Sequence, residues 1–295
     1  MTQSVTDATP VANDTADPAV PKVRAPRSVV VYLSYGWLTV VLAAALLAGV
    51  LPLASYSIPV GPPRQAPEFG SLDLLLGTDS QGRSVLSRCV YGAQVSLVVG
   101  AAAGVVGAAL GTVLGMPAGY FGRRFDSVVR LVADTMLAFP PLILLLALSS
   151  ILTPSVRTLL AGLTLLIIPS FIRLSRATTL SWVARDFVLA ARNMGAGHRR
   201  VLTRELLPNV LPTLGAYLPV VMAALIVAEG SLSFLGLGIP PPRPSWGGMI
   251  AEGKDTIADS PHMVFVPSLV IFLTVFALNQ TGDHLRHRFD RALRD

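Results

Sequence analysis

The stretch DFVLAARNMGAGHRRVLTRELLP, residues 186–208, is a polar, arginine-rich island between long apolar runs. Asp186 is of a residue type that caps helix N-termini, which predicts a short helix directly after it. Gly195 stands where that helix is expected to end, because glycine adopts the left-handed backbone conformation without steric penalty. A second short helix is predicted over Arg199–Leu207, and Pro208 is expected to separate it from the next apolar run.

The apolar runs on either side of the island decide the fold class. Of the 295 residues, 52% are hydrophobic and 14% are charged, whereas a soluble domain carries about a quarter charged residues. Six segments approach or exceed the length needed to cross hydrocarbon, and they are Val29–Ala54, Ala93–Pro117, Val128–Leu152, Arg157–Ile172, Val210–Ala228 and Val264–Gln280. The fourth is the shortest. The sequence therefore predicts an all-α membrane protein with six transmembrane helices, whose backbone polar groups are paired within the helices.

The distribution of basic residues predicts the orientation. Most of the 23 Lys and Arg residues lie in the N-terminal tail, the second-to-third connection, the 186–208 island and the C-terminal tail. Cytoplasmic loops carry this excess, so both termini and the island are expected in the cytoplasm. Residues 1–28 are expected to be a disordered tail, 29–282 the transmembrane domain and 283–295 a basic tail. Because the net charge of +6 is spread over short loops, no nucleic-acid partner is expected.

Nothing in the sequence predicts catalysis, a metal site or a bound cofactor. The single Cys89 forms no intrachain disulfide and the four histidines are scattered. Gly248-x4-Gly253-Lys254-Asp255 differs from a phosphate-binding loop at its last position, where a carboxylate would repel phosphate. The chain is therefore not expected to bind ATP or to be an enzyme.

Two features of the apolar runs predict how helices meet. Small residues at four-residue spacing let a neighbouring helix approach closely in lipid, and here they are Gly100, Gly104, Gly107, Gly111, Gly115 and Gly119. In the third segment, Asp134 is costly in hydrocarbon and needs a partner. Arg173 or Arg176 could provide it, and a structural ion pair is favoured over a substrate or proton role. Pro140-Pro141 is expected to bend or break the third helix.

The island resembles the "EAA" loop of ABC-importer permeases, which binds the ATPase subunits. The family pattern is E-A-A-x3-G-x9-I-x-L-P, and Leu189 and Glu205 stand where the pattern has Glu and Ile. The resemblance implies that this loop couples the chain to ATPases. The residues expected to contribute are Asp186, Ala190, Ala191, Arg192, Asn193, Gly195, Arg199, Leu207 and Pro208.

Two outer stretches resemble the dipeptide, oligopeptide and nickel branch of these importers. Leu76–Arg88 is similar to L-G-T-D-x-x-G-R-D-x-x-S-R, with Ser84 in place of Asp, and Leu232–Gly247 is similar to L-S-F-L-G-L-G-x-P-P-P-x-P-S-W-G. The second stretch is expected to contact a solute-binding protein or to form a lid on the outer vestibule. Its candidate residues are Leu235, Gly236, Gly238, Pro240 and Trp246.

The resemblance implies a type I ABC-importer permease of the C-type subunit class in a bacterial cytoplasmic membrane. Such a subunit pairs with a second, related permease and with two ATPases that hold ATP and Mg²⁺. A separate solute-binding protein delivers the substrate, expected to be a short peptide, with a nickel chelate or haem as alternatives. A secondary transporter or channel working alone and a membrane scaffold remain open, and copurification with ATPases would separate all three.

Overall fold

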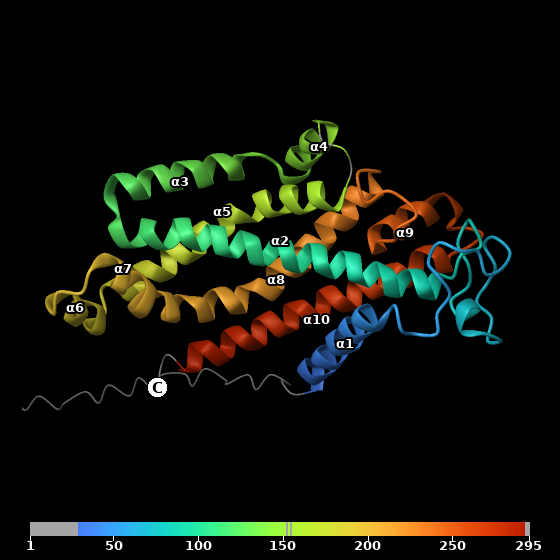
Figure 1. Cartoon of the computed structure of the whole chain (residues 1–295), viewed down its shortest axis with the longest axis horizontal. Coiled ribbons are helices and arrows are strands. Elements are labelled where there is room, and N and C mark those ends of the chain that lie inside the picture. The colour runs from blue at the N-terminus through green and yellow to red at the C-terminus, as the bar shows by residue number, and fades with distance from the viewer. Residues whose placement is uncertain (1–28, 152, 154, 293–295) are drawn as a thin grey trace, which may run out of the picture.

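The computed structural model describes residues 29–151, 153 and 155–292, and this part of the chain is helical with no β-strand. Five long helices run along the molecule (Figure 1), and they are α1 (Val29–Leu47), α2 (Val85–Phe121), α5 (Val156–Val183), α8 (Leu207–Phe234) and α10 (His262–Ala292). The expected N-terminal tail lies outside the described residues. The C-terminal tail expected from residue 283 instead continues α10 as far as Ala292.

Among the described residues, five helices are long and apolar enough to cross a membrane, and a bent pair forms a sixth candidate span. The pair consists of α3 (Arg123–Ala138) and α4 (Pro141–Ile151), which meet at 84°. Pro140 and Pro141 lie at this break, where neither can donate a backbone hydrogen bond to α3. The chain thus has the expected six apolar segments, with the third broken at the expected prolines.

The fourth segment is longer than predicted. α5 has 28 residues and keeps Pro169 inside the helix, where the prediction ended at Ile172. The prediction stopped because Arg173 and Arg176 follow. Both arginines are ion-paired to carboxylates of α3, so the helix continues past them as a packed element.

The break predicted at Pro208 is wrong. α7 (His198–Arg200), a π-helical turn (Val201–Leu206) and α8 form one continuous helix. The Leu207 N–H donates to the Leu202 carbonyl, five residues earlier. Such a wide turn relieves the clash between a proline ring and the preceding turn, so Pro208 begins α8 instead of ending a helix.

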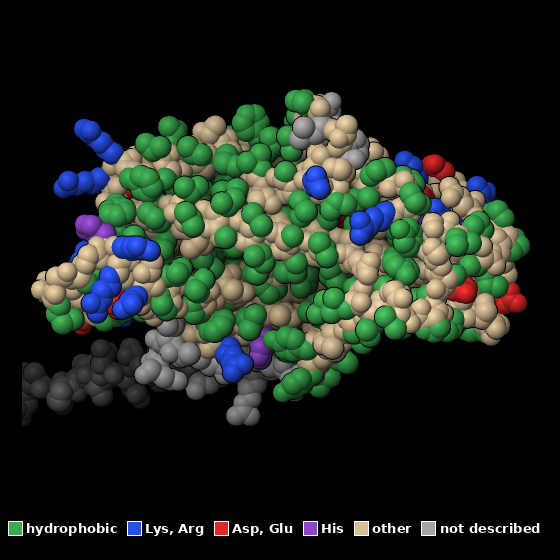
Figure 2. Space-filling model, viewed as in Figure 1, with side chains coloured by type: hydrophobic (Ala, Val, Ile, Leu, Met, Phe, Trp, Pro, Cys, Tyr) green, Lys and Arg blue, Asp and Glu red, His purple; other side chains and the backbone are tan. Residues whose placement is uncertain are grey.

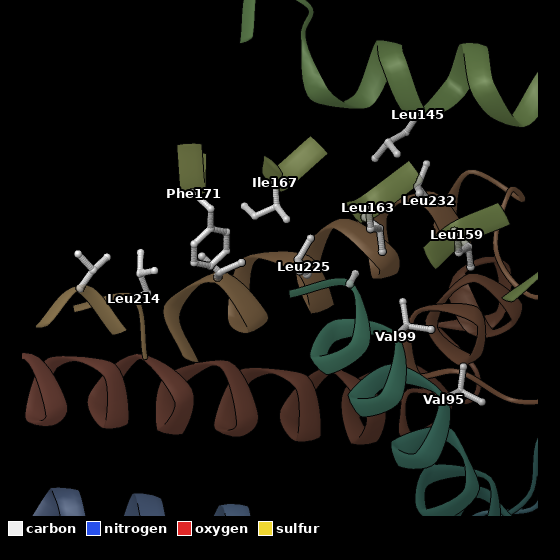
Figure 3. Packing of buried hydrophobic residues seen from close by; sticks show 13 residues of the cluster. Val95, Val99, Leu145, Leu159, Leu163, Ile167, Phe171, Leu214, Leu225 and Leu232 are labelled. Atoms are coloured by element: carbon white, nitrogen blue, oxygen red, sulfur yellow. The ribbon is translucent and has the colours of Figure 1, made fainter. Parts of the chain in front are cut away.

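The main core lies where α2, α5 and α8 meet (Figure 3). Val99, Leu163 and Phe171 are fully buried there, and Leu225 is 1% exposed. Side chains from three helices interlock in this cluster, which fixes α5 against the two longest helices.

The glycine stripe of α2 allows this close packing. Gly107, Gly111, Gly115 and Gly119 face α5, and Gly100 and Gly104 face α8. A Cβ atom on Gly111 would lie 3.0 Å from both the Ile168 carbonyl oxygen and the Ile172 nitrogen. Backbone atoms cannot move aside as a flexible side chain can, so the stripe serves as the expected close-approach surface.

Candidate functional site

The 186–208 island projects from one end of the bundle. α6 (Asp186–Asn193) and α7 form the tip beyond the long helices (Figure 1). Figure 2 shows Lys and Arg side chains gathered at this end, while hydrophobic side chains dominate the middle of the molecule. An apolar middle with a basic end is the charge pattern of a membrane protein whose basic end faces the cytoplasm.

α6 begins one residue earlier than the capping prediction implies. Arg185 is the N-cap and makes no side-chain capping bond, and Asp186 is the first helical residue. The Asp186 carboxylate therefore acts in the first turn, where a negative charge favours the helix dipole.

Gly195 ends α6 in the way the sequence predicts. Its φ is +84°, in the left-handed region that glycine adopts without penalty. The Ala196 N–H donates to the Ala191 carbonyl (3.0 Å), and the Gly195 N–H donates to the Arg192 carbonyl (2.9 Å). This pair of bonds is a Schellman motif, and it turns the chain sharply from α6 into α7.

One face of α6 is packed against the bundle. Val188 is fully buried in a cluster that contains Met116 and Tyr120 of α2, and Ala191 is 6% exposed. Leu206 completes the cluster from the π-helical turn. The loop is therefore fixed to the ends of α2 and α8 instead of hanging free.

Tyr120 makes the polar contacts of this joint. Its hydroxyl lies 2.8 Å from His198 Nδ1, and the Arg192 guanidinium carbon lies 4.6 Å from the centre of its ring. A cation over an aromatic face is attracted by the ring quadrupole. Tyr120 was not selected from the sequence, although the neighbouring Gly119 and Gly122 mark the end of α2.

Apolar side chains on both flanks of α6 and at its C-cap are exposed. Phe187 is 39% exposed, Leu189 44% and Met194 81%. Ala190, Asn193, Gly195, Arg199 and Pro208 are also exposed, whereas Arg192 and Leu207 are partly buried. The nine predicted residues thus lie together at one end of the molecule, and the side chain at the Leu189 position belongs to the exposed apolar surface.

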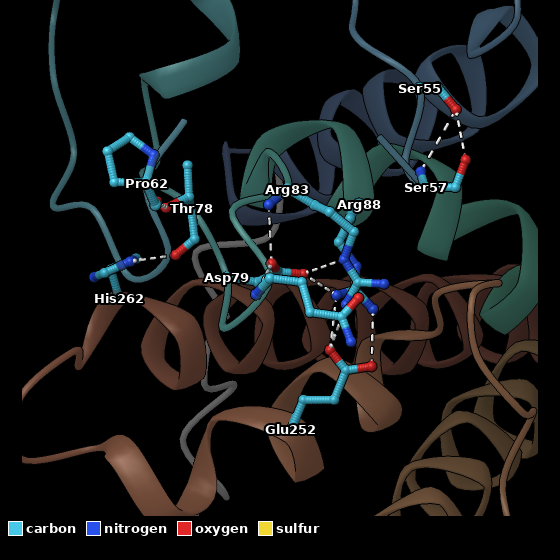
Figure 4. Close-up of polar contacts among 10 residues, drawn as sticks. Ser55, Ser57, Pro62, Thr78, Asp79, Arg83, Arg88, Glu252 and His262 are labelled. Carbon is cyan, nitrogen blue, oxygen red and sulfur yellow. Dashed lines mark hydrogen bonds and ion pairs between the residues drawn. The ribbon is translucent and has the colours of Figure 1, made fainter. Parts of the chain in front are cut away.

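At the other end of the bundle, four charged side chains form a compact ionic cluster (Figure 4). Arg88 donates two hydrogen bonds to Glu252, from Nη1 to Oε2 (2.7 Å) and from Nη2 to Oε1 (2.9 Å). Arg83 Nε lies 2.6 Å from Asp79 Oδ2, and Arg88 also contacts Asp79. These contacts tie the 76–84 turn and the start of α2 to α9 (Trp246–Gly253).

Asp79 is the charge centre of this cluster. Burial alone would raise the pKa of its carboxyl, but the Arg83 backbone N–H and the charge of Arg88 outweigh burial and hold the pKa below its usual value. The carboxylate is therefore ionised across the physiological range, and the cluster remains an ion network.

Trp246 belongs to the stretch expected to contact a solute-binding protein or to form a lid, and the structure places it as a buried structural residue. It is fully buried, and its indole Nε1 donates to the Cys89 carbonyl oxygen (2.9 Å). Ser245 caps α9 by accepting from the Gly248 N–H. The indole bond holds Trp246 against α2, and its ring packs in a cluster with Ala93 and Ile226.

The remaining outer candidates do come together. Leu235, Gly236, Gly238 and Pro240 line an open pocket of about 650 Å³, together with Glu252 and Lys254. Three of these four are exposed, and Gly238 is buried against Ser233. The end of α8 thus forms one wall of a hollow at the end of the bundle opposite α6.

Glu229 of α8 was missed by sequence reasoning. It is 1% exposed and accepts hydrogen bonds from Ser233 Oγ (2.8 Å) and Ser96 Oγ (3.2 Å). A glutamate inside an apolar run was the available signal. Its two serines lie 133 residues upstream and four residues downstream, so only the fold brings all three together.

The carboxylates of α3 pair with arginines of α5, and Asp134 pairs with Arg173, one of the two partners expected for it. Arg173 Nη2 lies 2.6 Å from Asp134 Oδ1. Arg176 instead donates to Asp126 through Nε and through Nη2 (2.8 Å). The two helices are antiparallel, so the arginine nearer the α6 end of α5 meets the carboxylate near the start of α3.

Comparisons with known proteins agree with the helical arrangement. Residues 111–295 match the family model described as "Binding-protein-dependent transport system inner membrane component". The "Probable peptide ABC transporter permease protein" of Sinorhizobium fredii is 41% identical over 245 residues, which cover 83% of this chain and 84% of that protein. The "Glutathione transport system permease protein" of Escherichia coli is 37% identical over 220 residues, covering 75% and 73%.

A solved structure shows the same fold. An inward-facing structure of the MetNI methionine ABC transporter aligns with a TM-score of 0.53 at 19% identity. The alignment covers 70% of this chain and 95% of the transporter chain.

Proposed function

The chain belongs to the family of binding-protein-dependent transport system inner membrane components, and from this premise we propose that it is the permease subunit of an ATP-driven importer of short peptides. In this proposal it forms half of the translocation pathway beside a second, related permease. Two ATPases on the cytoplasmic face hold ATP and Mg²⁺, and an extracytoplasmic solute-binding protein delivers the peptide.

The observation that carries the coupling role is the exposed face of α6. Phe187, Leu189 and Met194 present apolar side chains at a tip that is otherwise polar and basic. An apolar centre with a charged rim is typical of a protein–protein contact. The partner surface that fits it is an apolar cleft with an acidic rim on a soluble ATPase.

The contacts behind α6 provide a way to transmit movement. Val188 packs on Met116 and Tyr120 of α2, and Tyr120 joins the end of α2 to His198 and Arg192. A displacement of α6 by a docked ATPase therefore acts on α2 and α8 directly. This supports a coupling role for residues 186–208 as a unit, with the Schellman turn at Gly195 fixing the angle between its two helices.

The peptide assignment rests on relatives whose names specify peptide and glutathione transport. The alternative cargoes are a nickel chelate and haem. Uptake of labelled di- and oligopeptides, nickel and haem should be compared between cells that lack the gene and the same cells complemented. Loss of peptide uptake alone supports the assignment, and loss of another solute alone would replace the cargo while leaving the permease role intact.

The coupling role has its own experiment. The tagged chain should retain two ATPase subunits when purified in mild detergent, and Phe187→Asp with Leu189→Asp should release them. A matched double substitution on α1, Val40→Asp with Leu46→Asp, would place two charges in a candidate membrane span, so it is not a suitable control. Asp255→Ala in the short 3-10 helix after α9 (Lys254–Thr256) is suitable, and it should leave ATPase retention unchanged.

The proposed topology places α6 in the cytoplasm and the ionic cluster outside. In a Cys89→Ser background, Asn193→Cys should react with an impermeant thiol reagent in inside-out vesicles and remain unmodified in intact cells. Asp259→Cys, which lies beyond α9, should show the opposite behaviour. The reverse result at both positions would overturn the orientation.

A further inference from the structure

One ion pair between two candidate spanning segments, α3 and α5, has both of its side chains exposed. Asp134 of α3 and Arg173 of α5 are in contact, yet their side chains are 57% and 58% exposed. Asp134 Oδ2 and Arg173 Nε and Nη1 have no hydrogen-bond partner among the described residues. Each of these atoms needs a donor or acceptor from outside the chain.

A second pair on the same two helices shows what a shielded contact looks like here. Arg176 and Asp126 are joined by two hydrogen bonds, and their side chains are 23% and 10% exposed. This pair already fastens α3 to α5. The Asp134–Arg173 pair is therefore not needed to hold the two helices together, and its exposure requires another explanation.

The surface around Asp134 is apolar and belongs to a candidate span. Leu131 is 67% exposed, Val132 49% and Leu137 40%. Charged side chains at membrane depth are costly in hydrocarbon, and they face a partner or a water-filled cavity. An exposed ion pair with unfilled hydrogen-bonding capacity consequently does not fit a lipid-facing surface.

The end of α3 points to water independently. The last carbonyl groups of a helix lack partners, and Pro140 and Pro141 have no N–H with which to supply them. Phe139, at the break, is 54% exposed. Non-helical backbone at membrane depth is tolerated where protein buries it or where it lines a water-filled cavity.

We propose that the face of α3 carrying Leu131, Asp134 and Leu137 lines the water-filled passage of the importer, with Arg173 beside it. Water then hydrates the free atoms of the ion pair and the carbonyls at the helix break. The pair is net neutral, so it places charge on the wall of the passage without repelling solutes of either sign. This inference rests on the proposed function, because a passage exists only in an assembled transporter.

Thiol accessibility tests the proposal while keeping the ion pair intact. Leu131→Cys and Leu137→Cys are made singly in the Cys89→Ser chain, and the complex with its partner subunits is placed in lipid nanodiscs. A charged methanethiosulfonate reagent then measures the rate of labelling. Ala133→Cys, which is fully buried, and Val40→Cys, which is 61% exposed on the charge-free α1, are the matched controls.

Both α3 cysteines should react at least about tenfold faster than the two controls, because an apolar environment that raises a thiol pKa by one unit lowers its reactive thiolate fraction tenfold. Labelling no faster than at Val40→Cys would mean that lipid covers this face. Slow labelling together with a disulfide cross-link to the second permease would mean that a subunit interface covers it, and either result overturns the proposal. Retention of the ATPases by the same preparation reports on the proposed function separately.

Discussion

Arg192 lies over the ring of Tyr120, with its guanidinium carbon 4.6 Å from the ring centre. The contact joins the last turn of α6 to the last turn of α2, which are 72 residues apart in the sequence. Tyr120 is only 8% exposed, so its ring is both a packing element and the acceptor for the cation. Tyr120 therefore joins the end of α2 to the 186–208 loop.

Replacing Tyr120 should separate these two roles. Tyr120→Phe keeps the ring beneath Arg192 and loses the hydrogen bond to His198, at a cost of about 0.5–1.5 kcal/mol. Tyr120→Ala also removes the ring, and truncation of a buried aromatic residue costs about 3–5 kcal/mol. Peptide uptake at matched expression should decline modestly in the first variant and be lost in the second, and equal uptake by both would contradict this order.

The ionic cluster of Asp79, Arg83, Arg88 and Glu252 should be more sensitive to loss of an arginine than the exposed Asp134–Arg173 pair. Arg88 is 2% exposed, and Arg88→Met leaves Asp79 and Glu252 with Arg83 as their remaining shared partner. Removal of one partner from a buried ion pair costs about 3–5 kcal/mol. Arg173→Met breaks a pair that is more than half exposed, and such pairs contribute at most about 1 kcal/mol. Thermal unfolding in detergent should show the larger shift for Arg88→Met, and a larger shift for Arg173→Met would refute the ranking.

The low pKa of Asp79 predicts an acid dependence of stability. Despite burial, its pKa lies below the ordinary 3.8 because Arg83 and Arg88 favour the carboxylate. A carboxyl group with a lower pKa in the folded state stabilises the fold above its unfolded pKa, and this contribution is lost as pH falls through the folded value. Unfolding measured from pH 7 downward should lose stability below about pH 4, and Asp79→Asn should reduce that slope. Asp259→Asn, an exposed carboxylate, should leave the slope unchanged.

Much of the fold could be predicted from local patterns. The break at Pro140-Pro141, the turn at Gly195 and the close packing of the α2 glycines each depend on backbone chemistry that a residue type carries by itself. Helix ends were predicted less well, because Arg173 and Arg176 appear to end a span until their partners on α3 are known.

The parts that sequence reasoning missed depend on contacts between distant segments. Arg88 and Glu252 are 164 residues apart, and nothing in either neighbourhood specifies the other. Tryptophan is enriched at membrane interfaces, but the indole N–H of Trp246 donates to the Cys89 carbonyl oxygen on another helix. The pairing of Arg176 with Asp126, not Asp134, follows from the relative register of α3 and α5, which hydropathy does not encode.

The glycine stripe offers a test of the α2–α5 contact. A Cβ atom on Gly115 would lie only 3.0 Å from the Ile172 Cα, and closer still to the Ser175 side chain. Gly115→Ala should therefore destabilise the chain, since overpacking costs about 1–3 kcal/mol. Gly36→Ala on α1 is the matched control because its Cβ meets nothing within 4 Å, and alanine favours a helix over glycine by about 1 kcal/mol. The two substitutions should shift the unfolding temperature in opposite directions.

Two glycines of the coupling loop allow the turn to be tested without changing any contact. A Cβ atom on either Gly195 or Gly197 would meet nothing within 4 Å. They differ in conformation, since φ is +84° at Gly195 and −66° at Gly197. Gly195→Ala places a side chain in the left-handed region at a cost of about 1–2 kcal/mol, whereas Gly197→Ala is compatible with its backbone.

The substitution strains the backbone of the Schellman motif at Gly195. Because this motif sets the angle between α6 and α7, the strain favours other angles. A penalty of about 1–2 kcal/mol shifts an equilibrium roughly 5–30-fold, so a smaller fraction of Gly195→Ala molecules presents Phe187 and Leu189 in the docking geometry. ATPase retention and peptide uptake should both fall in this variant and stay at the parental level in Gly197→Ala, with equal amounts of both proteins in the membrane. Equal losses in the two variants would show that the loop responds to side-chain bulk and not to the left-handed turn, and the coupling geometry proposed for Gly195 would have to be abandoned.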